Sequence, residues 1–167
     1  LSGNVRFVQD KGAKLYRRSM YTYWKRSAPA PSMTIFDAPT REKCVVERPR
    51  TNTPLQALVT LNDPQFLEAA RHLAKRMMKE GGMTPTERVS YGYRLVTSRK
   101  SKPLVAQILA SAFREEYENY KKNPDTAGKL LAIGDSKRDE SVEATEHAAW
   151  TIVASMLLNL DEVITRM

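Results

Sequence analysis

The chain has 167 residues, of which 41% are hydrophobic and 28% charged, and its formal net charge is +8. This length suits one domain with a sizeable core, and the composition is ordinary for a globular protein. No apolar run approaches the roughly 18 residues of a membrane-spanning helix, so we expect no such segment. The chain begins at Leu1 without a signal peptide, and we expect it to be a piece of a longer protein.

Residues 1–50 are predicted to be irregular with short strands. In MYTYW (residues 20–24), tyrosines alternate with other aromatic and β-branched residues, a pattern typical of a strand. VRFV (residues 5–8) is a candidate partner strand. The two prolines of SAPAPSM then stop any regular ladder, and a turn-rich segment follows.

Helices are predicted after residue 50. Thr53 and Asp63 each precede a proline, which combines a capping side chain with the residue best suited to a first helical position. The first of these helices is short. The second ends at the glycine pair 81–82 and has an amphipathic stripe of Phe66, Ala70, Leu73, Ala74 and Met77.

Three further helices follow. Thr84 starts the third, Ser101 is the expected cap of a fourth over residues 102–122, and the last covers residues 142–160. The fourth has an apolar stripe of Leu104, Val105, Ile108, Leu109, Ala112, Phe113, Tyr117 and Tyr120, and the last has Ala149, Ile152, Val153, Met156 and Leu160. A loop with one helical turn, AGKLLAI, connects the two helices.

The apolar stripes of the second, fourth and last helices are expected to form one core. The predicted fold is therefore mainly α: four to five packed helices in residues 51–167 and a small N-terminal strand and loop region in residues 1–50. We treat residues 1–167 as a single domain, the C-terminal portion of a longer one.

Each histidine follows a glutamate by four residues, in the pairs Glu68/His72 and Glu143/His147. Two such helices could converge on a metal ion, but di-iron bundles use a spacing of three with further glutamates. We interpret both pairs as solvated surface pairs and assign no metal. The only cysteine, Cys44, is interpreted as a small buried residue, because no CxxC or haem-attachment motif accompanies it. No cofactor is assigned.

No catalytic site can be derived from the sequence. There is no G-x-S-x-G nucleophile elbow and no glycine-rich phosphate loop with its lysine. Asp37, Glu42 and Asp63 are candidate acid and base groups for an alternative function, an enzyme acting on polysaccharide. Whether the chain is part of an enzyme therefore stays open.

The positive charge is concentrated at the N-terminus, where residues 1–50 hold 11 Lys and Arg against 4 Asp and Glu, while residues 51–167 hold 16 against 15. In YRRSMYTYWKR, basic groups alternate with aromatic ones, which suits stacking on sugars or bases together with contact to an anionic chain. The alternative is a half-buried strand with extended Arg and Lys side chains. We hypothesise one basic face formed by Arg17, Arg18, Lys25, Arg26, Arg41, Arg48 and Arg50, beside Tyr21, Tyr23 or Trp24.

Two long segments resemble a known family. RRSMYTYWKRSAPAPSMTIFDAPTREKCVVERPRTNTPLQALVTLNDPQFLEAARHLAKRM and the closing AAWTIVASMLLNLDEVITRM are similar to a bacterial domain of unknown function, number 1553, typical of planctomycetes. The resemblance covers essentially the whole chain. It implies the C-terminal part of a large exported protein, often with a cytochrome-c-like domain upstream, and hence an extracytoplasmic location at the periplasm or cell surface. It supplies no activity and no catalytic residues.

The positions that match this family include Phe36, Asp37, Arg41, Cys44, Arg50, Thr51, Asn52, Thr53, Pro54, Gln56, Asn62 and Asp63. A helix start needs neither Arg50 nor Asn52 nor Gln56. These residues either form hydrogen bonds that tie the irregular region to the helices, or they line a pocket. We favour the hydrogen-bonded tie, because buried irregular backbone needs hydrogen-bond partners.

The leading functional expectation is an uncharacterised module that contacts a ligand or cell surface through its basic, aromatic N-terminal region. Its expected partners are the upstream segment of the parent protein and an anionic polysaccharide, rather than nucleic acid. The candidate ligand-binding residues are Arg17, Arg18, Tyr21, Tyr23, Lys25, Arg26, Arg41, Arg50, Asn52 and Gln56.

Overall fold

The structure is a computed structural model of the chain, and it describes residues 7–17, 19–25, 28–47, 49 and 51–165. The chain divides into two compact units, an N-terminal unit, Leu1–Val59, and a helical unit, Thr60–Met167. The division falls inside a helix, later than the change from irregular to helical sequence expected at residue 50.

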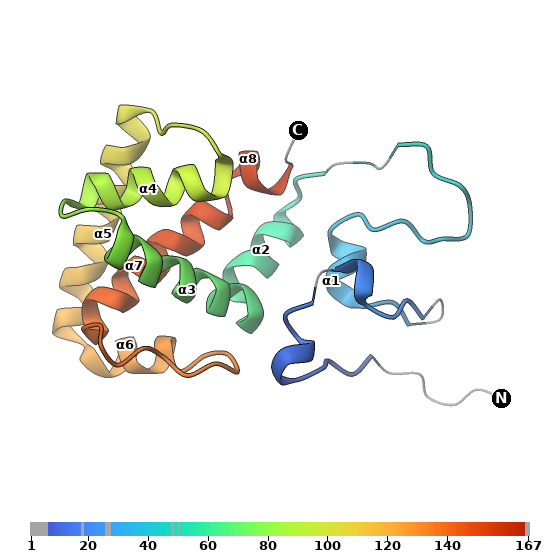
Figure 1. Cartoon of the computed structure of the whole chain (residues 1–167), viewed down its shortest axis with the longest axis horizontal. Helices are drawn as coiled ribbons and strands as arrows, with labels where there is room; N and C mark the ends of the chain where they lie inside the picture. Colours follow the sequence, from blue (N-terminus) through green and yellow to red (C-terminus); the bar gives the residue numbers. More distant parts are fainter. Residues whose placement is uncertain (1–6, 18, 26–27, 48, 50, 166–167) are drawn as a thin grey trace. The chain divides into compact units, whose positions relative to one another are not determined.

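The described residues are mainly helical, as predicted (Figure 1). The α-helices are α1 (Pro31–Ile35), α2 (Pro54–Asn62), α3 (Pro64–Glu80), α4 (Pro85–Thr97), α5 (Pro103–Lys122), α6 (Pro124–Leu131), α7 (Ala144–Leu158) and α8 (Asp161–Ile164). Two short 3₁₀ helices, Gly12–Lys14 and Ser19–Tyr21, precede them. The prediction of four to five helices was too low, because it did not include α1 and treated α6 as a single turn.

The predicted N-terminal strand is wrong. Ser19–Tyr21 forms a 3₁₀ helix, and no strand occurs anywhere in the described ranges. A strand needs a second chain segment to pair with its amide and carbonyl groups. Phe7 and Val8 of the expected partner have no regular structure, and the rest of that segment lies outside the described residues.

The prolines start helices more often than the sequence analysis expected. Pro31 occupies the first position of α1, where its missing amide proton is not needed, so the SAPAPSM segment contains a helix rather than a break. Asp63 caps α3 by accepting a hydrogen bond from the Gln65 amide at 2.8 Å, as predicted. Thr84 forms a reciprocal capping box with Glu87 at the start of α4.

The predicted cap of α5 is wrong. Ser101 does not cap this helix, which follows Lys102 without a side-chain cap. The Ser101 hydroxyl instead donates a hydrogen bond to the Ser90 hydroxyl of α4 at 3.0 Å. At the start of α7, the Glu143 carboxylate accepts hydrogen bonds from the amides of Thr145 and Glu146.

The core of the helical unit surrounds α7, which is buried on nearly every side. Trp150 of α7 is completely buried and stacks on Phe113 of α5 with 4.1 Å between ring centroids. The expectation that α3, α5 and α7 share one core is confirmed, and α4 contributes Val89 and Tyr93 to it. The sequence analysis did not include Trp150 in the predicted stripe.

Part of the α5 stripe faces water instead. Leu104 and Ile108 are 66% and 57% exposed, whereas Leu109 is buried. The sequence places apolar residues at adjacent positions there, and adjacent helical residues point about 100° apart, so only one of each pair can face the core.

Among the described residues, no helix is both long and apolar enough to cross a membrane.

Candidate functional site

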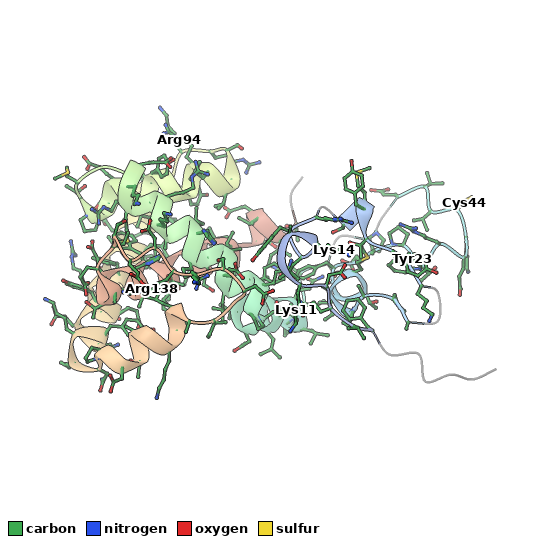
Figure 2. All side chains as sticks on the ribbon, turned by 60° about the horizontal axis from the view of Figure 1, so that its bottom comes forward. Lys11, Lys14, Tyr23, Cys44, Arg94 and Arg138 are labelled. Carbon is green, nitrogen blue, oxygen red and sulfur yellow. The ribbon has the colours of Figure 1, made fainter. Side chains whose placement is uncertain are left out.

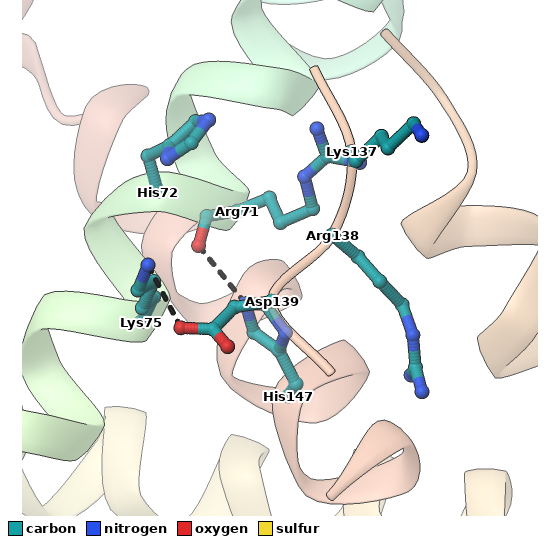
Figure 3. Close-up of a pocket in the computed structure, with 7 residues that line it drawn as sticks. All are labelled: Arg71, His72, Lys75, Lys137, Arg138, Asp139 and His147. Carbon is teal, nitrogen blue, oxygen red and sulfur yellow. Dashed lines mark hydrogen bonds and ion pairs between the residues drawn. The ribbon is translucent and has the colours of Figure 1, made fainter. Parts of the chain in front are cut away.

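A basic pocket of about 160 Å³ lies in the helical unit, between α3, α7 and the loop that joins α6 to α7 (Figure 3). Its volume is below the roughly 300–1,000 Å³ of pockets that take drug-sized ligands. It therefore suits a small ion or one charged group of a larger molecule. We call it the basic pocket and define it by its lining residues: Arg71, His72, Lys75, Lys137, Arg138, Asp139 and His147.

Arg71 forms the inner wall of the pocket and holds the α6–α7 loop. It is only 3% exposed. Its guanidinium donates hydrogen bonds to the carbonyl of Leu131, and to the carbonyl and hydroxyl of Ser136 at 2.7 and 2.8 Å. Leu131 is the last residue of α6, where carbonyl groups lack partners within the helix. Arg71 thus fixes the end of α6 and the start of the loop.

Glu68 holds the same loop from one turn earlier on α3. Its buried carboxylate accepts hydrogen bonds from the amides of Asp135 and Ser136 at 2.9 and 3.1 Å, and lies 3.9 Å from the Arg71 guanidinium. Gly134 makes this approach possible, because its φ is +103° and an added Cβ would lie 2.4 Å from the Glu68 carboxylate. The position of the next residues, Lys137 and Arg138, follows from this turn.

His147 of α7 lies on the pocket wall and is 1% exposed. Its Nε2 atom is 3.0 Å from the Arg71 carbonyl oxygen, the contact drawn as a dashed line in Figure 3. Its Nδ1 atom is buried and has no hydrogen-bond partner within the described part of the chain. Burial lowers the pKa of His147 below its ordinary value of 6.5, and the Arg71 and Arg138 cations lower it further. The imidazole is therefore neutral at pH 7.5.

The remaining charges of the pocket are unevenly neutralised. Asp139 accepts from Lys75 and Lys79, each at 2.8 Å, and these hydrogen bonds, with those of Ser141, hold the pKa of Asp139 well below its ordinary range. The Lys137 and Arg138 side chains form no hydrogen bond or ion pair with any described residue. Arg138 nevertheless interacts electrostatically with the Glu143 carboxylate. The cations that line the pocket outnumber its lining acid, Asp139, so the pocket favours an anion.

The surface interpretation of the two Glu/His pairs is corrected by this geometry. His72 is exposed, but its partner Glu68 is buried and holds the loop. His147 is buried, and Glu143 caps α7 rather than pairing with it. Within the residues that the structure describes, no group of three or more His, Cys, Asp or Glu side chains is placed to hold a metal ion.

In the N-terminal unit, Gln56 ties α1 to the start of α2. Its amide nitrogen donates to the Ile35 carbonyl at 2.9 Å and the Thr51 hydroxyl at 3.0 Å, while its amide oxygen accepts from the Thr53 amide at 2.9 Å. Asp37 accepts from the Thr51 amide at 3.0 Å and hydroxyl at 2.7 Å. Gln56 is buried, so the structure places it in the tie that the sequence analysis favoured.

The other candidate ligand-binding residues of the N-terminal unit are exposed where the structure describes them. Tyr21 and Tyr23 are 62% and 82% exposed, and the side chain of Tyr23 is visible in Figure 2. The Arg41 guanidinium carbon lies 5.5 Å from the centre of the Trp24 ring. Arg17, Lys25 and Asn52 are also exposed, whereas Arg18, Arg26, Arg48 and Arg50 lie outside the described residues. A single convergent basic face stays a prediction.

The three candidate carboxylates of the alternative enzyme have different surroundings. Asp37 belongs to the tie, Asp63 caps α3, and Glu42 is exposed. The alternative thus loses two of its three candidates to structural hydrogen bonds.

Cys44 was expected to be buried and is instead exposed on an irregular segment (Figure 2).

A family model described as a protein of unknown function (DUF1553) matches residues 3–113. The chain belongs to this family. No curated protein and no solved structure matches the chain. The match includes the α3 half of the basic pocket, with Arg71, His72 and Lys75, and ends before the α6–α7 loop and α7.

The sequence analysis missed the basic pocket, although it noted several of its residues. It recorded both histidines and treated residues 123–141 as a loop without a role. One signal was available: the sequence GDSKRD places two cations shortly after a glycine, in the segment that leads to the helix containing His147. The inward orientation of Arg71 could not be predicted from the sequence of α3, because cations and apolar residues alternate along that helix.

Proposed function

We propose that the chain is a binding module whose basic pocket holds a small anion, or the anionic group of a larger molecule. The observation that supports this most strongly is the excess of cations among the lining residues, where Lys137 and Arg138 form no ion pair with a described residue and the wall contains buried Arg71 and His147. Hydrogen bonds between ionised groups are stronger than neutral ones, and salt screens the partly buried Arg138 less than the exposed Lys137.

The test is anion binding by isothermal titration calorimetry at low ionic strength, with inorganic phosphate as the probe. The double variant Lys137→Ala/Arg138→Ala should bind phosphate at least about tenfold more weakly, because each charge-assisted hydrogen bond contributes roughly 1.5–3 kcal/mol. The matched control is Arg99→Ala/Lys100→Ala, which removes two adjacent exposed cations that do not line the pocket. Equal weakening of both variants would show that phosphate responds only to net charge.

A second candidate function is contact between the N-terminal unit and an anionic polymer such as an acidic polysaccharide. The exposure of Tyr21 and Tyr23, and the stacking of Arg41 on Trp24, favour it, because these are groups that stack on sugars and contact anionic chains. On an immobilised polyanion, Arg17→Ala/Lys25→Ala/Arg41→Ala should elute at lower salt than Arg99→Ala/Lys100→Ala/Lys102→Ala. Coelution of the two triple variants would show that only net charge matters.

The location is part of this proposal. The resemblance to large exported proteins motivates an extracytoplasmic setting, with the upstream segment of the parent protein as a partner. Fractionation of the native host should then recover the parent protein with the periplasm or cell envelope. Recovery with the cytosol would contradict it.

A further inference from the structure

Asp139 is the one acid among the residues that line the basic pocket, and lysines hold its carboxylate. It accepts a hydrogen bond from Lys75 at 2.8 Å, drawn as a dashed line in Figure 3, and another from Lys79 at 2.8 Å. Lys75 also lines the pocket, whereas Lys79 does not. The basic pocket therefore contains a carboxylate of its own, paired with one of its own cations.

The α6–α7 loop has other attachments to α3 besides Asp139. Glu68 accepts hydrogen bonds from the amides of Asp135 and Ser136, and Arg71 donates to the carbonyl and hydroxyl of Ser136. These two side chains are buried, whereas the lysines that hold Asp139 are partly exposed. Ion pairs that reach the solvent add little to stability, because water and salt screen them. Holding the loop is therefore a task that Glu68 and Arg71 already perform.

We infer that Asp139 is an internal competitor, whose carboxylate occupies Lys75 in place of the anion that the basic pocket binds. This inference rests on the anion-binding function proposed above and concerns the regulation of the same pocket. An incoming anion must either displace the carboxylate from Lys75 or bind beside it against the repulsion of its charge. Because the chain tethers Asp139 next to Lys75, its effective concentration there is high, on the order of millimolar or more.

The surroundings of Asp139 keep this competitor charged. Hydrogen bonds from Lys75, Lys79 and Ser141 hold the pKa of Asp139 well below its ordinary value of 3.8. The carboxylate is therefore ionised at neutral pH, and Lys75 is available to an external anion only when the carboxylate moves away or loses its charge by substitution.

The first test is Asp139→Asn, titrated with inorganic phosphate by calorimetry at pH 7.5 and low ionic strength. The amide oxygen of asparagine can still accept from the Ser141 amide, which lies 3.0 Å from the Asp139 carboxylate. The variant lacks the charge that binds Lys75, so we expect it to bind phosphate at least about threefold more tightly than the wild type. Its thermal midpoint, measured alongside, shows whether it folds.

The matched control is Asp125→Asn, which removes the same charge from the first turn of α6, outside the lining of the pocket. Its affinity for phosphate should stay within about 1.5-fold of the wild type, because salt screens charges that lie apart. A gain as large as that of Asp139→Asn would show that phosphate responds only to net charge, and would overturn the inference.

Lys75→Ala separates competition for the lysine from simple repulsion by Asp139. In the wild type it should weaken phosphate binding by no more than about twofold, because the carboxylate already occupies Lys75. In the Asp139→Asn chain it should cancel the gain, and this coupling is the signature of a shared partner. Lys137→Ala is the matched control in the wild type and should weaken binding more than Lys75→Ala does. This comparison needs no substitution of Asp139.

The outcomes distinguish the inference from the proposed function. Unchanged or weaker phosphate binding by folded Asp139→Asn would overturn the competition and leave anion binding intact, since the carboxylate would then help to build the site. Equal weakening by Lys75→Ala and Lys137→Ala in the wild type would also overturn it, because Lys75 would then be free to bind the anion. Absence of phosphate binding in both the wild type and Asp139→Asn would overturn the proposed function and this inference with it.

Discussion

Replacing Arg71 by alanine is expected to lower the free energy of unfolding by about 3–5 kcal/mol, the range measured when one partner of a buried ion pair is removed. The variant would leave the Glu68 carboxylate buried without its nearest cation, which is 3.9 Å away. It would also remove the donors to the carbonyls of Leu131 and Ser136. The loop would lose its attachment to α3, so phosphate binding should decrease together with stability.

Arg76→Ala is the matched control for this experiment. Arg76 lies on the same helix and pairs with Glu80 at 3.3 Å, but its side chain is 53% exposed. Exposed pairs of this kind contribute little to stability, because water and salt screen them. Urea denaturation of both variants at pH 7.5 measures the difference. Similar losses of stability would mean that the buried contacts of Arg71 do not hold the loop.

Replacing Trp150 by alanine should destabilise the helical unit by about 3–5 kcal/mol, as expected for truncating a large buried aromatic side chain. Trp150 is completely buried, stacks on Phe113, and accepts the Arg88 guanidinium over its ring at 5.8 Å. Its removal would leave a cavity at the centre of the core, where α3, α4, α5 and α7 meet.

Leu104→Ala provides the control, since this α5 side chain is 66% exposed although the sequence pattern placed it in the core. Substitutions at exposed positions usually change stability by no more than about 0.5 kcal/mol. Chemical denaturation should therefore separate the two variants by several kcal/mol. A small effect of Trp150→Ala would show that the core is not organised around α7.

The helical unit was largely predictable because its signals are local. Thr84 and Asp63, each followed by a proline, mark helix starts through hydrogen bonds that involve only the next three residues. The strand expected around Tyr21 and Tyr23 would need a second segment to pair with, and a local sequence pattern does not show whether such a segment lies beside it. Ser101 failed as a cap for a similar reason, since its hydroxyl bonds to Ser90 on a neighbouring helix.

The basic pocket was not predictable, because it depends on which side chains the tertiary structure turns inward. Glu68 and Arg71 look like ordinary surface charges of an amphipathic helix. They are buried because the α6–α7 loop offers them two amides and two carbonyls. The orientation of the His147 ring depends on the Arg71 carbonyl, which lies 3.0 Å from Nε2 and 76 residues away along the chain.

The most direct test of anion binding in the basic pocket is nitrogen-15 NMR of the histidine side chains, titrated with phosphate at pH 7.5. The chain has two histidines. The resonances that disappear in His147→Gln therefore belong to His147, and those that remain belong to His72. We predict that His147 is neutral with its proton on Nε2, and that phosphate in the basic pocket shifts the His147 side-chain resonances with the same affinity that calorimetry measures. Side-chain resonances of His147 that stay unchanged while phosphate saturates the chain would contradict the account, because the anion would then bind elsewhere.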